Sequence, residues 1–351
     1  MTDFTDVSPA LALRRLIFGH RVTQLIAVAT QLGIADQLGD QALTAAELAA
    51  HVDADPLALY RLLRALASVG VMTMDVDERF ALTPIGASLR RDARDSQRAW
   101  VLMESADFYQ RVWSGLAAAV HSGLPAAEQA LGAPIYEYLG ANAQASAIFQ
   151  QAMADASQLA ADAVVAAYPL PPAAHVVDIG GGYGTLLMVL LLAHPTARGT
   201  LFERQAVLDG AKARIEAADL GSRCTLAGGD FFAAIPVGGD VYILSRILMD
   251  HDNAHCITIL RNCHQAMAPN ARLLIVQQVL PDTHADPALF DGAMSDLNML
   301  VFLPGRERTA AEYHALLAAA HFAVTQITPT RALMSVIEAR PITPTYASDA
   351  L

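Results

Sequence analysis

The sequence predicts a two-part protein: a helical winged-helix unit at the N-terminus, followed by an α/β domain with a doubly wound parallel sheet. Helical periodicity and two short extended runs fill roughly the first ninety residues. From residue 171 onward strands alternate with helices, and a glycine-rich turn follows the first of those strands. A chain of 351 residues that is 54% hydrophobic and 17% charged is long enough for both parts and a large core.

The N-terminal elements follow one another as three helices and a wing. The second helix opens with Thr44 and Glu47 in the pattern of a capping box. The third begins at Asp55 and Pro56, and we expect it to end at Gly70, because proline favours the first helical turn and glycine the residue after the last. In order, the expected elements are helices at 11–38, 44–52 and 56–70 and extended runs at 71–76 and 79–84.

The charge of this unit argues against DNA binding, the activity that a winged helix first suggests. Arg61 and Arg64 are the only basic residues of the expected recognition helix, and the wing carries Asp75, Asp77 and Glu78. The whole chain has a net charge of −12, and phosphate contacts need a basic face. We therefore expect a scaffold or dimerisation role and no nucleic-acid partner; a DNA-binding regulator is the weakest alternative.

The rest of the chain changes from helical to alternating texture. Residues 96–168 are expected to be helical, with a loop-like interruption at 123–134. The alternation that follows predicts a parallel sheet with helices on both faces. Its segments are 175–179, 185–195, 199–203, 205–220, 224–230, 240–246, 254–268 and 272–280, closed by a helix at 309–320 and strands at 322–328 and 332–340. The predicted domains are 1–95, 96–170 and 171–351.

Cysteine usage and the N-terminus indicate the compartment. Cys224, Cys256 and Cys263 are widely spaced and form no CxxC pattern, so we expect buried or free thiols in a reducing environment. The N-terminus has no basic segment before an apolar stretch. The longest apolar run, 186–193, is too short to cross a bilayer. These features predict a cytoplasmic protein with no membrane partner.

The turn 176-VVDIGGGYGTLL-187 is the most specific motif. Asp178 ends a buried strand, and Gly180 and Gly182 begin a run of glycines at alternate positions. Glycines let the backbone turn sharply and approach a ligand, and the following helix N-terminus offers amide donors. A dinucleotide fingerprint would need its third glycine at Thr185, so it fails here. The form acid-x-Gly-x-Gly-x-Gly resembles the S-adenosylmethionine signature, and the leading acid suits an ammonium group.

Acidic residues also end the next two strands. Glu203 ends the second strand, where its carboxylate can accept hydrogen bonds from both ribose hydroxyls. The third strand ends in 229-GDFF-232, where Asp230 can meet an adenine amino group and Phe231 can pack on the adenine ring. Because the carboxyl ends of parallel strands meet at one edge of a sheet, these side chains form one set. The set predicts S-adenosylmethionine binding.

With these motifs the chain resembles the class I small-molecule O-methyltransferases, the group of plant caffeic-acid-type enzymes and bacterial natural-product methyltransferases. The resemblance covers nearly the whole chain, from the winged-helix dimerisation region to 304-PGRERTAAEY-313. The segments 239-GDVYILSRILMD-250 and 261-RNCHQAMAP-269 are most similar to phenazine methyltransferases, enzymes of antibiotic and other secondary metabolism.

This resemblance implies partners and site residues. It implies a homodimer in which the N-terminal helices of two subunits intertwine and help to close each other's pockets. It implies that the Rossmann-like domain holds S-adenosylmethionine through Asp178, Gly180, Gly182, Glu203, Asp230 and Phe231, with Ser245 or Arg246 near the methionine end. The pocket for a small aromatic substrate should lie over the C-terminal edge of the sheet. Its expected lining residues are Tyr109, Trp113, Phe149, Met153, Asn298, Met299 and Phe302.

The resemblance also shows that the family's usual base is missing. Met249 stands where the family has a histidine, Asp250 keeps the acid that follows, and His251 replaces a tryptophan. Gln277 stands where the first of two orienting glutamates is expected, and Glu307 matches the second. The catalytic set is therefore largely dismantled at two coupled positions.

Methyl transfer is an in-line displacement at a sulfonium carbon, and the loss of a base does not abolish it. Alignment of the reactants can lower the barrier by roughly 7–11 kcal/mol, whereas general-base help adds typically about 10²–10⁴-fold. We expect transfer to a phenolic hydroxyl of a phenazine-like natural product, mainly by proximity. Two alternatives remain: N-methylation of an aromatic heterocycle, and a family member that keeps the cofactor for chemistry other than methyl transfer.

His251 is the candidate replacement base. On a strand-like path its side chain would face the same side as Met249, and on a helical turn it would not. The alternative is a histidine that is hydrogen-bonded within a loop. We expect Asp250 to be structural rather than catalytic. No metal site is expected, since no metal-ligand spacing stands out and three further histidines have no visible partner: His20, His121 and His255.

Overall fold

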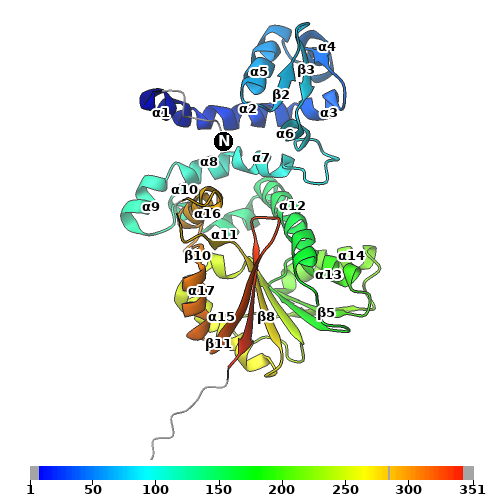
Figure 1. The fold of residues 1–351 in the computed structure, drawn as a ribbon, viewed down its shortest axis with the longest axis vertical. Coiled ribbons are helices and arrows are strands. Elements are labelled where there is room, and N and C mark those ends of the chain that lie inside the picture. The colour runs from blue at the N-terminus through cyan, green and yellow to red at the C-terminus, as the bar shows by residue number, and fades with distance from the viewer. Residues whose placement is uncertain (1–7, 284, 343–351) are drawn as a thin grey trace, which may run out of the picture. The chain divides into compact units, whose positions relative to one another are not determined.

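The structure, a computed structural model, describes residues 8–283 and 285–342 (Figure 1). The chain divides into two compact units. The N-terminal unit comprises residues 1–111 and 139–155, and the C-terminal unit comprises residues 112–138 and 156–351.

The N-terminal unit is helical with a small antiparallel sheet in the order β1-β3-β2. The predicted capping box is present, because the Thr44 side chain accepts the Glu47 amide while the Glu47 carboxylate accepts the Thr44 amide. Leu63, Leu66 and Phe80 are fully buried in its core. Its helices are α1 (Pro9–Ile17), α2 (Gly19–Gln31), α3 (Ile34–Leu38), α4 (Ala45–Val52), α5 (Pro56–Ser68), α6 (Pro84–Ala87) and α7 (Arg98–Glu104), and its strands β1 (Leu43–Thr44), β2 (Met72–Met74) and β3 (Arg79–Leu82).

Two expectations for the helical parts of the chain differ from the structure. The helix expected over 11–38 is three helices, because Gly33 adopts a left-handed conformation with φ of 69° and separates α3 from α2. The interruption expected at 123–134 contains a short helix, α10 (Ala127–Leu131), that ends at the left-handed Gly132. Three further helices have residues in both units: α8 (Asp107–Trp113), α11 (Ile135–Ala141) and α12 (Ala143–Ala167).

The C-terminal unit contains a seven-stranded sheet in the order β11-β12-β8-β7-β4-β5-β6 (Figure 1). Strands β4 to β8 are parallel, and β12 and β11 add an antiparallel edge. The main strands are β4 (His175–Ile179), β5 (Arg198–Glu203), β6 (Cys224–Gly228), β7 (Val241–Ser245), β8 (Arg272–Gln277), β11 (Phe322–Pro329) and β12 (Ser335–Pro341). The prediction of a doubly wound α/β fold is confirmed.

Short connections and helices complete this unit. The segment expected as one strand at 272–280 is two, because β9 leaves the main sheet after Gln277 and pairs in parallel with β10. The remaining elements are α9 (Leu116–Ser122), α13 (Thr185–Ala193), α14 (Gln205–Ala217), η1 (Leu248–Asp250), α15 (Asn253–Ala266), β9 (Val279–Leu280), α16 (Ala288–Phe302), β10 (Arg308–Thr309) and α17 (Ala310–Ala318).

Alternation along the strands divides the core between the two faces of the sheet. In β7, Val241 and Ile243 face one cluster, whereas Tyr242 and Leu244 face the other. Helices α13 and α14 cover the first face, and α15 and α17 cover the second (Figure 1). Strand β4 lies between β5 and β7, so the strand order reverses there. Ligands of open α/β sheets bind at such a switch point, beyond the carboxyl ends of the strands.

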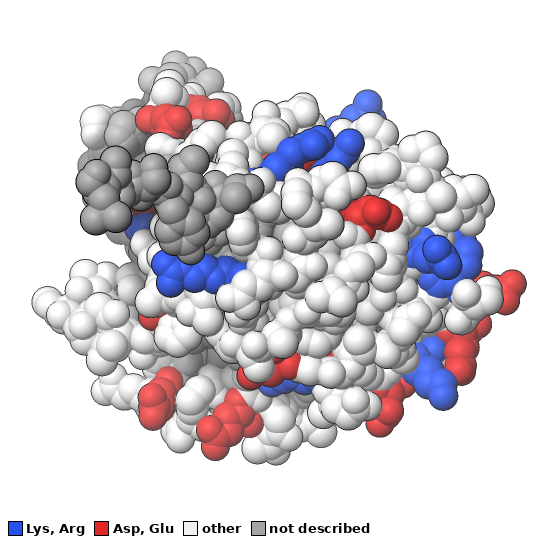
Figure 2. All heavy atoms as spheres, turned by 90° about the horizontal axis from the view of Figure 1, so that it is seen from below, with Lys and Arg blue, Asp and Glu red and all other residues white. Residues whose placement is uncertain are grey.

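Surface and thiol chemistry add two observations. On the face shown in Figure 2, acidic and basic side chains are interspersed among uncharged ones rather than gathered by sign. All three cysteines are buried free thiols. Within the described ranges, none of the helices combines the length and apolar character that crossing a membrane requires.

Candidate active site

The glycine-rich turn after β4 is shaped by left-handed backbone. Gly180, Gly182 and Gly184 have φ of 66°, 57° and 78°, a region that side chains with a Cβ rarely adopt. The Gly180 amide donates to the Phe202 carbonyl at 2.8 Å, which ties the turn to the end of β5. A Cβ added to Gly182 would meet open space, so its glycine is required by conformation and not by crowding.

Asp178 lies directly beneath this turn. Its side chain is fully buried, and a Cβ added to Gly181 would come within 2.3 Å of Asp178 Oδ2. Neither carboxylate oxygen of Asp178 is hydrogen-bonded within the described part of the chain. Burial, and to a lesser extent the Glu203 carboxylate, raise the pKa of Asp178 to about 7. A buried unpaired carboxyl of this kind favours a cation nearby.

Acids at the ends of β5 and β6 surround the same turn. Glu203 Oε2 accepts the Gly182 amide at 3.1 Å, and its Oε1 accepts the Arg204 amide at 2.7 Å. Asp230 Oδ1 accepts the Phe232 amide at 2.8 Å, and the residue is exposed. These carboxylate acceptors and the close backbone fit the ribose hydroxyls and the adenine amino group of a nucleoside cofactor.

The end of β7 packs against the glycine turn from the other side. A Cβ added to Gly180 would lie 2.7 Å from Ile247 Cδ1 and 3.4 Å from the ring of Phe231. Arg246, just before Ile247, has a left-handed φ of 57°, although it is not a glycine. Strained backbone of this kind concentrates at functional sites. Ser245 and Arg246 are both half-buried at this strand end.

Met249 and the residues at the two expected glutamate positions are buried. Met249 is 5% exposed, Glu307 is 2% exposed and Gln277 is fully buried. The Gln277 amide and Glu307 Oε2 have no hydrogen-bond partner within the described ranges, while Glu307 Oε1 accepts the Ser295 hydroxyl at 2.8 Å. Burial raises the pKa of Glu307, and the Ser295 and Gln277 side chains act against that shift. Neither a thioether nor a neutral amide is a base.

Two residues that the sequence did not single out hold the turn containing Met249. Arg308 is fully buried, and its guanidinium donates to the carbonyls of Leu248 at 2.9 Å and of His251 at 3.0 Å. A Cβ added to Gly305 would come within 1.8 Å of the Met249 carbonyl oxygen. The motif 304-PGRERTAAEY-313 contains both residues, but only the fold shows that they grip this turn.

His251 belongs to an aromatic cluster. The turn before it is the 3-10 helix η1, and the His251 backbone is extended. Its ring makes edge contacts with Phe231 and Phe232, with centroids 6.0 and 5.3 Å apart, and its nitrogens form no hydrogen bond with other described residues. Burial and then His255 lower the pKa of His251. The ring therefore lies beside Phe231, the residue expected at the adenine.

The expectation that His20 and His255 lack partners was wrong. His255 Nδ1 lies 2.8 Å from Asp252 Oδ1, and His20 Nδ1 lies 2.9 Å from the Ile17 carbonyl. Both partners are three residues away along a helix turn, a spacing that local sequence could have suggested. No group of three or more metal-ligating side chains occurs among the residues that the structure describes.

Asp250 has a partner from a distant segment. The Tyr136 hydroxyl, on α11, donates to Asp250 Oδ2 at 2.9 Å. Asp250 is half-buried. Burial raises the pKa of Asp250 to about 6, and the Tyr136 hydroxyl and the Arg246 charge oppose that shift. Nothing in the local sequence could have paired residues 114 positions apart.

The residues expected to line a substrate pocket fall in both units. In the C-terminal unit, Trp113 Nε1 donates to Asn298 Oδ1 at 3.1 Å, and Met299 and Phe302 are buried on the same helix, α16. The other three belong to the N-terminal unit, and their place in one pocket stays a prediction: Tyr109, Phe149 and Met153.

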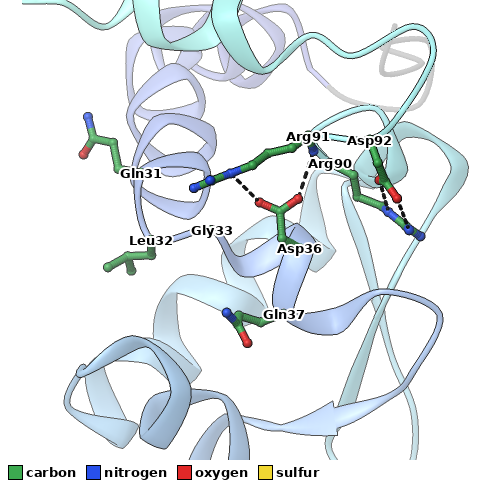
Figure 3. A pocket seen from close by; sticks show the side chains of 8 residues that line it. All are labelled: Gln31, Leu32, Gly33, Asp36, Gln37, Arg90, Arg91 and Asp92. Carbon is green, nitrogen blue, oxygen red and sulfur yellow. Dashed lines mark hydrogen bonds and ion pairs between the residues drawn. The ribbon is translucent and has the colours of Figure 1, made fainter.

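A separate hollow of about 430 Å³ lies in the N-terminal unit beside α3 (Figure 3). Its charges are satisfied internally. Arg91 Nε lies 3.2 Å from Asp36 Oδ2, and Arg90 Nε lies 2.9 Å from Asp92 Oδ1. Because these ion pairs are formed within the hollow, we assign it no ligand.

Comparison with known proteins gives matches in both parts of the chain. Residues 113–323 match the O-methyltransferase domain, and residues 14–92 match the O-methyltransferase dimerisation domain. The chain is 42% identical to the phenazine O-methyltransferase PhzM of Lysobacter antibioticus, over 94% of this chain and 96% of that protein.

Two further similarities are to an enzyme that methylates nitrogen and to a solved methyltransferase structure. The chain is 32% identical to the phenazine-1-carboxylate N-methyltransferase of Pseudomonas aeruginosa, over 92% of this chain and 95% of that protein. Its fold is similar to that of CalO1, a methyltransferase in calicheamicin biosynthesis solved in the SAH-bound form. The TM-score is 0.87 and the sequence identity 32%, covering 97% of this chain and all of CalO1.

Proposed function

The chain belongs to the O-methyltransferase family, and on that premise we propose that it methylates a phenolic hydroxyl of a phenazine-like aromatic natural product. It is an S-adenosylmethionine-dependent methyltransferase. The single observation that carries the proposal is the joint set at the carboxyl ends of β4, β5 and β6: a left-handed glycine turn over the unpaired Asp178, with Glu203 and Asp230 beside it. The similarity to a phenazine O-methyltransferase supports the substrate class.

Each residue of this set has a proposed role toward the cofactor. Glu203 binds the ribose hydroxyls, Asp230 binds the adenine amino group, and Phe231 packs on the adenine ring. Asp178 places negative charge beneath the turn, near the methionine end, where Ser245 and Arg246 also lie. Gly180 allows the close approach of Ile247, and Gly182 allows the left-handed backbone of the turn. When bound, S-adenosylmethionine supplies an electrophilic methyl group on a sulfonium.

Transfer is proposed to depend mainly on alignment. Met249 and Gln277 carry no proton acceptor of ordinary strength, so the family's histidine mechanism does not operate here. Arg308 and Gly305 restrain the turn that contains Met249. We propose that this turn forms one wall of the site for the methyl acceptor. Such positioning alone can lower the barrier by roughly 7–11 kcal/mol.

A second function, N-methylation of an aromatic heterocycle, is favoured by the same buried Met249. A neutral ring nitrogen has a free lone pair and no proton to lose, so it needs no base. The similarity to an enzyme that methylates a phenazine nitrogen supports this alternative. The two reactions differ in product, because one forms an ether and the other a cationic N-methyl ring.

The partner of the N-terminal unit is proposed to be a second copy of this chain. Helix α1 buries none of its residues, and Leu13, Leu16 and Ile17 on it are 60%, 63% and 60% exposed. An apolar face of this kind marks an interaction site. The match of residues 14–92 to a dimerisation domain supports a homodimer. The domain limits predicted from the sequence, at residues 95 and 170, likewise remain a proposal.

Incubation of ligand-stripped protein with S-adenosylmethionine and a panel of dihydroxyphenazines, flavonoids and quinones tests the function. We expect a methylated phenol and an equal amount of S-adenosylhomocysteine, measured by mass spectrometry. A product methylated only on nitrogen would replace the first function by the second. Absence of S-adenosylmethionine binding by calorimetry would overturn both.

A further inference from the structure

Met249 cannot accept the proton that a phenolic substrate loses on methylation. The next residue, Asp250, is paired with Tyr136. Asp250 ends η1, at the carboxyl end of β7. The Tyr136 hydroxyl binds one of its oxygens, Oδ2, at 2.9 Å. The other oxygen, Oδ1, accepts no hydrogen bond from any described residue. Asp250 thus keeps an acceptor site uncommitted.

The turn beneath Asp250 is held firmly, so its side chain has a defined position. Arg308 binds the carbonyls of Leu248 and His251, one on each side of the Met249–Asp250 pair. Gly305 abuts the Met249 carbonyl and the Asp250 carbonyl carbon. Tyr136 then orients the carboxylate from a different element. A proton acceptor must be held within hydrogen-bond reach of its donor, and this arrangement does so at the edge where cofactors bind.

The neighbouring titratable groups are less suited to the task. His251 turns its ring into contacts with Phe231 and Phe232. Glu307 is 2% exposed and one of its oxygens is bound to Ser295. Asp250 is half-buried, which leaves it reachable, and burial makes it more basic than an ordinary aspartate, with a pKa of about 6. A carboxylate of that pKa is ionised at neutral pH and can still accept a proton.

We propose that Asp250, oriented by Tyr136, is the proton acceptor for the phenolic substrate, in place of the family's histidine. The proposal rests on the proposed O-methylation. As the phenolic oxygen forms its bond to the methyl carbon, the bond from that carbon to sulfur breaks and the sulfur takes the electron pair. The phenolic proton passes to the Asp250 carboxylate, which later releases it to water. Asp250 is then a catalytic residue and Tyr136 a positioning residue.

The test compares two kinds of acceptor in the full-length wild-type protein and in Asp250→Asn. One acceptor, 1-hydroxyphenazine, is a weakly acidic phenol that carries its proton at the assay pH. The other, 4-nitrocatechol, is acidic enough to be largely ionised there. We expect Asp250→Asn to lower kcat on 1-hydroxyphenazine by about 100-fold or more, within the range of general-base catalysis, and to lower kcat on 4-nitrocatechol by much less. Equal losses on both acceptors, or no loss, would overturn the proposal.

Tyr136→Phe separates positioning from structure. Among the described residues, the charged and titratable groups that interact with Asp250 are Tyr136 on α11, Arg246 after β7 and Cys256 on α15. Because the Tyr136 hydrogen bond lowers the pKa of Asp250, its removal should move the acidic limb of the kcat profile to higher pH. An unshifted limb with a uniformly lower rate would contradict the positioning role. Asp252→Asn is the matched control for Asp250→Asn, because it makes the same change two residues away and asparagine caps α15 as aspartate does.

A spectroscopic measurement keeps the proposal separate from the function on which it rests. Phenol and phenolate forms of 1-hydroxyphenazine differ in visible absorbance. If the wild type binds this compound without methylating it, O-methylation of it fails, but the bound phenol should still ionise at higher pH in the wild type than in Asp250→Ala. The Asp250 carboxylate accepts the hydrogen bond of the neutral phenol and repels the phenolate, as it does for the Tyr136 hydroxyl. Identical ionisation in both proteins would overturn the role of Asp250, and failure to bind or methylate any phenol of the panel would overturn both proposals.

Discussion

The Cα of Gly305 lies so close to Met249 that a Cβ built on it would be 1.8 Å from the Met249 carbonyl oxygen. The same Cβ would lie 2.5 Å from the Asp250 carbonyl carbon and 2.6 Å from the His251 amide nitrogen. All three contacts are with backbone, which cannot rotate away. The loop after α16 therefore packs directly against the turn that contains Met249, the residue at the position of the family's histidine.

Substitution Gly305→Ala should displace this turn. We expect a loss of about 1–3 kcal/mol in the free energy of unfolding, as for other overpacked sites, together with a lower kcat. Urea denaturation and steady-state kinetics measure the two effects. Gly140→Ala is the control, because a Cβ there meets nothing within 4 Å. A Gly305→Ala protein as stable and active as that control would contradict the role of the close approach.

Substitution Arg308→Lys should loosen the same turn from its other side. The guanidinium bridges the Leu248 and His251 carbonyls and Asn253, and a lysine ammonium cannot reproduce this fork. Leaving buried carbonyls unpaired costs about 1–3 kcal/mol each. We expect a clear decrease in Tm by calorimetry. A Tm within the error of the wild type would show that the bridging bonds are dispensable.

Stability and cofactor affinity should both report the protonation of Asp178. Its pKa is about 7 in the folded protein against an ordinary 3.8, so between about pH 4 and 7 the folded state holds a proton that the unfolded state has lost. The free energy of unfolding therefore falls as pH rises through this window.

Binding of a cationic cofactor favours the ionised Asp178, so affinity should rise with pH through about 7 and binding should release protons below it. Asp178→Asn should flatten both dependences and weaken binding. Chemical denaturation and calorimetry across pH 5–8 provide the measurements. A pH dependence in Asp178→Asn equal to that of the wild type would assign it to another group.

Reinstalling the family's base requires two changes. Met249→His alone restores the histidine but leaves the neutral, fully buried Gln277 where the family has an orienting glutamate, and an amide cannot stabilise an imidazolium. The double variant Met249→His, Gln277→Glu supplies the acid. We expect the double variant, but not the single one, to raise kcat/KM for weakly acidic phenols, by at most about 10²–10⁴-fold. Equal rates for the single and double variants would refute the coupling.

Dimerisation should depend on the exposed face of α1. Leu16→Glu with Ile17→Glu places charge on two side chains that are 63% and 60% exposed in the single chain, so the fold of each copy should persist. We expect light scattering after size exclusion to show a dimer for the wild type and a monomer for the variant. Leu57→Glu, on α5 and 71% exposed, tests whether the effect is specific to α1. A variant that stays dimeric would remove α1 from the interface.

Local pattern was sufficient for the parts of the molecule that depend on neighbours in sequence. The glycine spacing, the capping box at Thr44 and the alternation of strands and helices each arise from residues within one or two turns. Parallel topology then places the ends of successive strands at one edge, so Asp178, Glu203 and Asp230 could be grouped in advance. The split of the helix at Gly33 was missed, since a glycine within a helical pattern does not always end it.

Only the tertiary structure decided how the transfer site is organised. The sequence determined that Met249 replaces a histidine, but packing decided that Met249 and Gln277 are buried, that Arg308 and Gly305 grip their turn, and that Tyr136 binds Asp250 across 114 residues. The physical reason is that burial and hydrogen-bond pairing depend on which segments meet in space. Periodicity records which face of an element is apolar and carries no information about which distant side chain will meet it.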